Sequence, residues 1–390
     1  MDNPFQLTFD YENYRRVIGG MDVILHCHHY NARIIHIIQS SKHINGKEIL
    51  VSSAEEVFSE YIKKFFKETD TVEDKWLLVK FLYRHLGFGL LDISKINSGV
   101  VTASTSHIVE GCDAGYQEIN YPVCNFTEGY LQGAYHAVTG ESVYFTEKTC
   151  LKLKEPECTF ILDKNRNDPI FFHKRFKKRI EMKRENKYQI SNIDEDLIVH
   201  TVSQMPLFGN EDGLIPAFNV YLANMPVDFY NLICLRFLED MEKKKLLSTA
   251  QNLLVIAGEI CAINTLRGFM NSREWKSLVE PMIKEESDNI FGLVALTNSL
   301  GWGNWHICEH EIEEKLIIES LNSYEATGFL KYKNEASISQ CYTLRGVATG
   351  MMELLYTDGS VEERIGSYDS EEYSCVAAGN YSCKFKVMPI

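Results

Sequence analysis

The chain has 390 residues, of which 45% are hydrophobic and 24% charged. At roughly 150 residues per domain, this length predicts two or three domains, and the composition excludes collagen-like, low-complexity and disordered chains. The formal net charge of −14 argues against general nucleic-acid binding, because contact with phosphates requires a positive surface. Eleven cysteines are too sparse for a disulfide scaffold, and an odd number cannot pair completely.

The first residues, MDNPFQLTFDYENYRR, lack the early positive charge and the apolar core of a signal peptide. The longest apolar stretch, Leu253 to Ile263, contains Glu259 and is shorter than the roughly 20 residues that span a membrane. We therefore expect a cytoplasmic protein without a membrane span, in which thiols favour metal binding or burial over disulfides.

Hydrophobic periodicity predicts helices followed by strands, twice along the chain. Two Gly-aromatic-Gly turns, one containing Phe88 and the other Trp302, each follow a predicted helix and lead into a strand. This order predicts an α+β fold with helices packed on antiparallel sheets. The predicted helices are 54–67, 72–85, 127–138, 227–244, 247–270, 274–299 and 344–356, and the predicted strands are 90–93, 159–162, 304–308 and 384–387.

A basic segment separates the two halves. Residues 173–187 read HKRFKKRIEMKRENK, with eight Lys or Arg against two Glu, a local charge of +6. Either this is a solvated linker or it docks an acidic partner or nucleic acid. The sequence predicts a first domain at 1–165, a basic linker at 166–195 and a second domain at 196–390.

Both halves contain the same spacing of cysteine, glycine and glutamate, which indicates an internal repeat. In each half a cysteine precedes a helical glycine by nine residues, and a Glu-x-x-Cys-x7-Cys pattern closes the half. The two sets are Cys124, Glu147, Cys150 and Cys158, and Cys341, Glu372, Cys375 and Cys383.

Three thiolates and one carboxylate are an acceptable tetrahedral donor set for zinc. The interval from the first cysteine to the glutamate is 23 residues in the first half and 31 in the second. The extra residues fall in the polar stretch 358–371, so Glu371 is an alternative to Glu372. The other interpretation is that all these cysteines are buried, reduced thiols. The remaining cysteines share no spacing, and we expect them in the core: Cys27, Cys112, Cys234, Cys261 and Cys308.

Histidines concentrate at His26, His28 and His29. If residues 23–28 form a strand, His26 and His28 share one face and are candidates for an acid–base or metal site. The alternative is a polar strand end that runs into a helix. Aromatic residues, among them Tyr135 and Trp302, either line an apolar pocket or belong to the core.

Residues 129–162 resemble the 4-vinyl reductase domain, whose signature is the closing Glu-x-x-Cys-x7-Cys. Cys124 lies where zinc-binding members in bacterial phenol-sensing activators have their first cysteine ligand. The resemblance covers about 80 residues of each half, from the Gly-aromatic-Gly turn onward. It implies two tandem domains of this type, each with one zinc bound by its three cysteines and its glutamate.

The resemblance also implies a small apolar or aromatic ligand, because sensor members hold such a molecule in a buried pocket beside the zinc. The aromatic residue that faces this pocket in sensors is Phe145 in the first half, but Ser370 stands there in the second. The candidate ligand-binding residues are Phe145, Tyr135, His136, Phe88 and Trp302.

We therefore expect a sensor, carrier or accessory factor, and a protein partner or homodimer stays open. The alternatives are an enzyme that uses the histidine cluster on a small hydrophobic substrate, and a protein-docking scaffold. The chain has no G-x-x-x-x-G-K-[ST] loop, which the ATPase domain of phenol-type activators contains.

Overall fold

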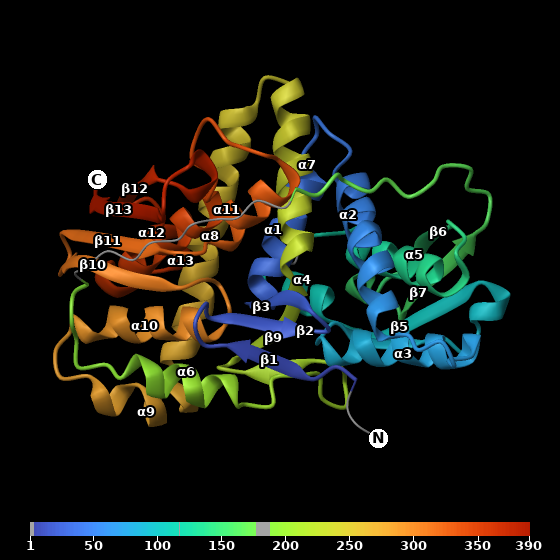
Figure 1. The fold of residues 1–390 in the computed structure, drawn as a ribbon, viewed down its shortest axis with the longest axis horizontal. Helices are drawn as coiled ribbons and strands as arrows, with labels where there is room; N and C mark the ends of the chain where they lie inside the picture. Colours follow the sequence, from blue (N-terminus) through green and yellow to red (C-terminus); the bar gives the residue numbers. More distant parts are fainter. Residues whose placement is uncertain (1–3, 117, 177–187) are drawn as a thin grey trace.

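The structure is a computed structural model that describes residues 4–116, 118–176 and 188–390. It has the predicted α+β architecture, with a central sheet between two outer sheets and helices packed around them (Figure 1). Every strand pair in these sheets is antiparallel.

Strands from both halves of the chain build the central sheet. The first half contributes β1 (Leu7–Asp10), β2 (Arg15–Ile18) and β3 (Met21–Cys27), and the second contributes β8 (Ile215–Ala217) and β9 (Val220–Pro226). The strand order is β1-β2-β3-β9-β8, so the halves join where β3 pairs with β9. The division at residues 165 and 195 stays a prediction, and the halves on either side of it share a sheet.

The two outer sheets have corresponding strand orders. One is β4-β5-β7-β6 and the other is β10-β11-β13-β12. The strands of the first are β4 (Gly89–Asp92), β5 (Val100–Ser106), β6 (Tyr144–Thr149) and β7 (Cys158–Asp163). Those of the second are β10 (Trp305–Glu311), β11 (Lys315–Ser320), β12 (Tyr368–Ser374) and β13 (Cys383–Pro389).

The helices also correspond in order. The first half has α1 (His28–Ser40), α2 (Gly46–Tyr61), α3 (Val72–His85), α4 (His107–Gly115) and α5 (Asn125–Thr139). The second half has α7 (Val227–Lys243), α8 (Leu247–Met270), α10 (Asp288–Ser299), α11 (Tyr324–Tyr332) and α12 (Tyr342–Tyr356). Further short helices of the second half are α6 (Glu195–Ser203), α9 (Arg273–Leu278) and α13 (Val361–Arg364).

Glycines bring two long helices of each half into close contact. α2 packs along α5, and α8 packs along α12. A Cβ atom on Gly133 would lie 2.7 Å from the backbone oxygen of Glu55, and one on Gly350 would lie 2.6 Å from that of Glu259. Both distances are too short for any side chain, which explains the glycine nine residues after each cysteine.

Each Gly-aromatic-Gly turn contacts the central sheet through a strand of the other half. The Leu25 N–H donates to Leu300 O (3.0 Å), and the Asn224 N–H donates to Leu86 O (2.8 Å). Gly87 and Gly301 follow those leucines with φ of +87° and +85°, a backbone region that favours glycine. These reciprocal bonds attach the halves to each other beyond the shared sheet.

The periodicity of 72–85 and 247–270 predicts α3 and α8 with the correct bounds. The predicted helix 274–299 is wrong, because the chain forms α9, a 3-10 turn at Glu280–Met282 and then α10. Pro281 lacks an N–H and restricts the preceding residue, which ends the first helix. The predicted strand 23–28 begins two residues too late and ends one residue too late, since β3 begins at Met21 and His28 begins α1.

By length and composition alone, α8 would suit a membrane span, which the apolar stretch 253–263 did not indicate. It is nevertheless 61% buried over its most apolar window and packs against α1, α7 and α12. Core helices of globular proteins have the same character, so this helix is weak evidence for a membrane span.

Buried ion pairs attach the first part of the segment between the two halves, residues 166–173, to α2. The Arg166 guanidinium donates to both carboxylate oxygens of Glu55. His173 donates its N–H to Glu56 Oε1 (2.8 Å), and Arg236 of α7 donates to Glu56 Oε2 (2.6 Å). Residues 177–187, most of the predicted basic run, lie outside the described residues.

Candidate metal centres

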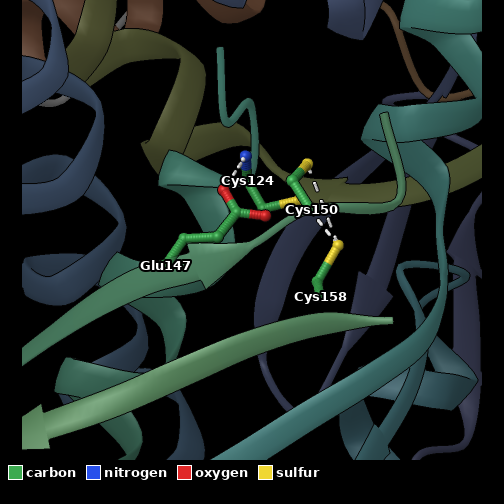
Figure 2. Close-up of side chains that lie close together, drawn as sticks. All are labelled: Cys124, Glu147, Cys150 and Cys158. Atoms are coloured by element: carbon green, nitrogen blue, oxygen red, sulfur yellow. Dashed lines mark hydrogen bonds between the residues drawn. The ribbon is translucent and has the colours of Figure 1, made fainter. Parts of the chain in front are cut away.

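Three segments of the first half bring four metal-ligating side chains together (Figure 2). Cys124 immediately precedes α5, Glu147 lies in β6, Cys150 follows β6 and Cys158 begins β7. Their donor atoms all lie within 4.8 Å of one another, and all four residues are buried. The sequence spacing therefore predicts this cluster correctly.

Local backbone features orient these side chains. A register shift between Glu147 and Thr149 interrupts the β6–β7 ladder, and a 3-10 turn at Leu151–Leu153 reverses the chain after Cys150. The Leu151 N–H donates to Cys158 Sγ (3.3 Å) across that turn. Backbone donation to a sulfur favours its thiolate form, which is the form that binds metals.

The three sulfurs and the carboxylate face a common centre. Cys124 Sγ lies 3.7 Å from Cys158 Sγ, which lies 4.0 Å from Cys150 Sγ. Glu147 Oε2 accepts the Cys124 N–H at 2.9 Å, whereas its Oε1 is buried without a hydrogen-bond partner in the described part of the chain. A bound cation would supply that missing partner.

Burial without a nearby positive charge shifts the pKa values of the acidic groups in this cluster. Burial, and then the neighbouring Cys150, raise the pKa of Glu147 to about 8. Hydrogen bonds from Cys124 and Cys158 lower the pKa of Cys150, while the pKa of Cys124 is raised well above its usual value. The cluster therefore favours one thiolate over three, and a divalent cation would reverse that preference.

The second half repeats this arrangement around Cys341, Glu372, Cys375 and Cys383. Cys341 precedes α12, and its Sγ lies 3.5 Å from Cys383 Sγ. The Cys341 N–H donates to Glu372 Oε2 (2.8 Å), and the Val376 N–H donates to Cys383 Sγ (3.4 Å). Here too, Glu372 Oε1 is buried without a hydrogen-bond partner within the described ranges.

Glu372 is the carboxylate that faces the sulfurs, whereas Glu371 is exposed. Neighbouring residues of a strand point to opposite faces of a sheet, so only one of the two faces the cluster. Burial, and then Cys375, raise the pKa of Glu372 to about 9. The eight-residue difference in spacing falls between α12 and β12, where α13 lies.

The donor chemistry fits a metal ion at both positions. Each cluster offers three soft sulfurs and one carboxylate oxygen, and zinc is bound by such groups in tetrahedral sites. The two clusters of three cysteines and one glutamate are therefore candidate metal sites.

A serine, which the sequence analysis did not identify, lies beside the first cysteine of each cluster. Ser106 Oγ lies 3.7 Å from Cys124 Sγ, and Ser323 Oγ lies 3.0 Å from Cys341 Sγ. Both serines cap the next helix, α4 or α11. Their identical offset of 18 residues before the cysteine is the only hint in the sequence.

Four of the five predicted ligand-binding residues are buried, namely Phe88, Tyr135, Phe145 and Trp302. Phe88 packs edge-on against Phe58, Tyr83 and Phe126, and Phe145 lies with its ring centroid 6.3 Å from that of Tyr135. The Trp302 Nε1–H donates to Leu25 O (2.8 Å). His136 is partly exposed at the C-terminal end of α5. Their role in ligand binding stays a prediction.

The histidine cluster divides between two environments. His26, fully buried, stacks on Tyr30 and Trp302. His28 lies beside His29, and its Nδ1 accepts the Tyr221 N–H (3.2 Å). Burial lowers the pKa of both His26 and His28 to about 3. Among the described residues, the groups able to hold a metal ion contain none of these histidines.

Two solved structures of known proteins show distant similarity to this chain. No protein-family profile matches it, and no curated protein does. The phenol-responsive sensory domain of the transcription activator PoxR, solved with phenol, matches 40% of this chain and 84% of that domain, with 15% identity and a TM-score of 0.33. A vinyl-4-reductase family protein from Methanocaldococcus jannaschii matches 28% of this chain and 66% of its own, with 19% identity and a TM-score of 0.20.

Proposed function

We propose that this chain is a zinc-binding protein of two tandem domains like the 4-vinyl reductase domain, which arose by internal duplication. Each half would hold one structural zinc, and the first half would bind a small apolar or aromatic molecule as sensor, carrier or accessory factor. The observation that carries the proposal is the pair of clusters of three cysteines and one glutamate, each with one buried carboxylate oxygen that lacks a partner among the described residues.

Four protein donors describe a closed site, which stabilises a fold, whereas a catalytic zinc keeps one open position. In the first half, Cys124 would connect the N-terminus of α5 to the β6–β7 turn, which supplies the other donors. A bound zinc would neutralise charge and cross-link these segments. Cys341 would connect α12 to the β12–β13 turn in the same way.

The ligand proposal rests on the interior of the first half and on the sequence resemblance. Phe145 is buried beside Tyr135, with their ring centroids 6.3 Å apart. At the position of Phe145 the second half has Ser370, whose Oγ accepts a hydrogen bond from Thr349 (2.7 Å). A polar pair is a poor lining for an apolar ligand, so we place the ligand in the first half.

Native mass spectrometry of freshly purified protein tests both parts of this proposal. We expect two zinc ions per chain and, after addition of phenol or another small aromatic probe, one bound probe molecule. A Phe145→Ser variant should keep both zinc ions and lose the probe, and Ser370→Thr is the matched control. A chain without metal would contradict the zinc sites, and probe binding that Phe145→Ser leaves unchanged would contradict the ligand site.

A further inference from the structure

Residues of α3, the helix at the lower right of Figure 1, line an apolar cleft of about 880 Å³. Its lining includes Phe5, Phe65, Leu78 and the unusually exposed Leu77 (46%) and Phe81 (47%). Phe208, 48% exposed, closes one side of the cleft. Large exposed apolar side chains gathered in one cleft are a mark of a binding surface.

The second half shows what covers the equivalent surface. Its counterpart of α3 is α10, and α6 packs on α10 (Figure 1). Three apolar residues of α6 are fully buried, namely Ile198, Val199 and Val202. Polar bonds fix the same contact, because Asn298 Nδ2 donates to Glu195 Oε1 (2.6 Å). An amphipathic helix of nine residues therefore occupies this position in the second half.

The two helices can be compared residue by residue, because each ends at a Leu-Gly-aromatic-Gly turn. Counting back from these turns, Leu77 corresponds to Phe291 and Phe81 to Ala295. Ala295 is only 1% exposed, whereas Phe81 is 47% exposed. The face of α3 that contains Leu77 and Phe81 therefore corresponds to the face of α10 on which α6 packs. Among the described residues, no helix covers this face of α3.

The same count places Arg84 where α10 has Asn298, the residue that binds Glu195. Arg84 and Lys67 both line the cleft, and the Arg84 Nε–H donates to Asn210 O (2.8 Å). Two aspartates also line the cleft, but each accepts a backbone N–H: Asp70 from Lys67 (2.7 Å) and Asp74 from Thr71 (3.0 Å). A guanidinium in place of an amide favours a carboxylate on the occupant more strongly.

We propose that the α3 cleft is a docking site for an amphipathic helix of a partner protein. The helix has the pattern of α6, with a carboxylate in its first turn and apolar residues three, four and seven positions later. Its apolar side contacts Leu77 and Phe81, and its carboxylate pairs with Arg84. This inference is independent of the zinc and aromatic-ligand proposals, because none of its residues belongs to those sites.

A synthetic peptide with the sequence of residues 191–205, SNIDEDLIVHTVSQM, is the probe. The intact chain already holds its own α6 at high effective concentration, so added peptide has only the α3 cleft to occupy. Fluorescence anisotropy with labelled peptide should show saturable binding to the full chain. Phe81→Ser and Arg84→Glu should each weaken it by about tenfold, since the two residues form the centre of the contact.

Two controls keep the test specific. Ile338→Ser removes an equally exposed apolar side chain (51%) far along the chain from the cleft, and it should bind like the unmodified protein. A peptide with Glu195→Arg should regain affinity for the Arg84→Glu protein through the exchanged charges. Absence of saturable binding, equal binding of a scrambled peptide, or binding that neither Phe81→Ser nor Arg84→Glu weakens would overturn the proposal.

Discussion

The two halves hold the same four donor residues in the same local frame, but their surroundings differ. In the first half Glu147 is buried and α5 runs almost directly into β6, whereas in the second Glu372 is partly exposed and α13 lies between α12 and β12. The donor frame depends on a helix start, a strand bulge and a 3-10 turn. These local features tolerate a change in the neighbouring loop, which explains how the clusters match while the halves diverge.

A second contrast lies where each pair of long helices crosses. Glu55 of α2 pairs with Arg166, whereas its counterpart Glu259 of α8 has Glu353 as a neighbour. Burial, and then Glu353, raise the pKa of Glu259 to about 7. The first half thus pairs its buried carboxylate directly with Arg166, although burial still raises the pKa of Glu55. In the second half the nearby Arg345 offsets the effects of burial and Glu353 only in part, so Glu259 stays protonated over part of the neutral range.

Loss of a metal ligand should have the largest effect. Cys150→Ser and Cys375→Ser should each remove one metal ion per chain and cost more than about 4 kcal/mol of stability, because a structural metal is lost. In a chain of this size we expect a drop in melting temperature of about 5 °C, measured by scanning calorimetry. Cys234→Ser, a cysteine outside both clusters, should retain both metal ions.

The comparison of Glu55 with Glu259 predicts opposite effects of glutamine substitution at pH 8, because Glu55 has a direct ion-pair partner, although burial raises the pKa of both carboxyls. In the unfolded chain Glu259 loses its proton near its ordinary pKa of 4.5, but in the folded chain its pKa is about 7. This group therefore lowers the stability of the fold as pH rises from about 4.5 to 7. Glu259→Gln should therefore raise the free energy of unfolding by about 2 kcal/mol at pH 8 and change it little at pH 4. Urea denaturation at both values measures this.

Glu55→Gln is the matched change in the first half. It should lower stability at pH 8 by about 2 kcal/mol, because Arg166 loses a buried partner. If the two substitutions had the same sign at pH 8, the contrast between the halves would be wrong.

The reciprocal turn contacts predict a smaller effect. Gly87→Ala and Gly301→Ala should each cost about 1–2 kcal/mol, because φ is positive at both positions. Gly87→Ala should cost more, since its Cβ would lie 2.7 Å from Ile215 while that of Gly301→Ala would lie 3.1 Å from its nearest neighbours. Urea titrations of both variants test the order.

The smallest effect is expected on the uncovered face of α3. Phe81→Ser should change the free energy of unfolding by less than about 0.5 kcal/mol, because Phe81 is already half exposed. Ile198→Ser, in the helix that covers α10, should cost about 2–4 kcal/mol by leaving a buried apolar site. A large loss of stability with Phe81→Ser would mean that α3 uses this face within the chain.

Local signals made part of this molecule predictable. Thr71 and Asp74 form a capping box that, with regular periodicity, defines α3. The metal donors were predictable because their spacing reflects short-range turns. The repeated spacing favours Glu372 over Glu371, and the strand register shows why only Glu372 faces the sulfurs.

Long-range pairing was beyond the sequence. β3 and β9 lie about two hundred residues apart in the chain, and nothing in either strand specifies its partner. Of the two interpretations of the histidine cluster, the strand end that runs into a helix matches the structure, since α1 begins at His28 and gives His26 and His28 different neighbours. The packing of α6 on α10 was equally hidden, because α6 is short and its apolar residues are few.

The metal content of the purified full chain tests the central claim most directly. Native mass spectrometry, combined with elemental analysis, should find two zinc ions per chain in the unmodified protein, one in Cys150→Ser and none in Cys150→Ser/Cys375→Ser. A folded, unmodified chain that carries no metal after purification in the presence of zinc would contradict the account.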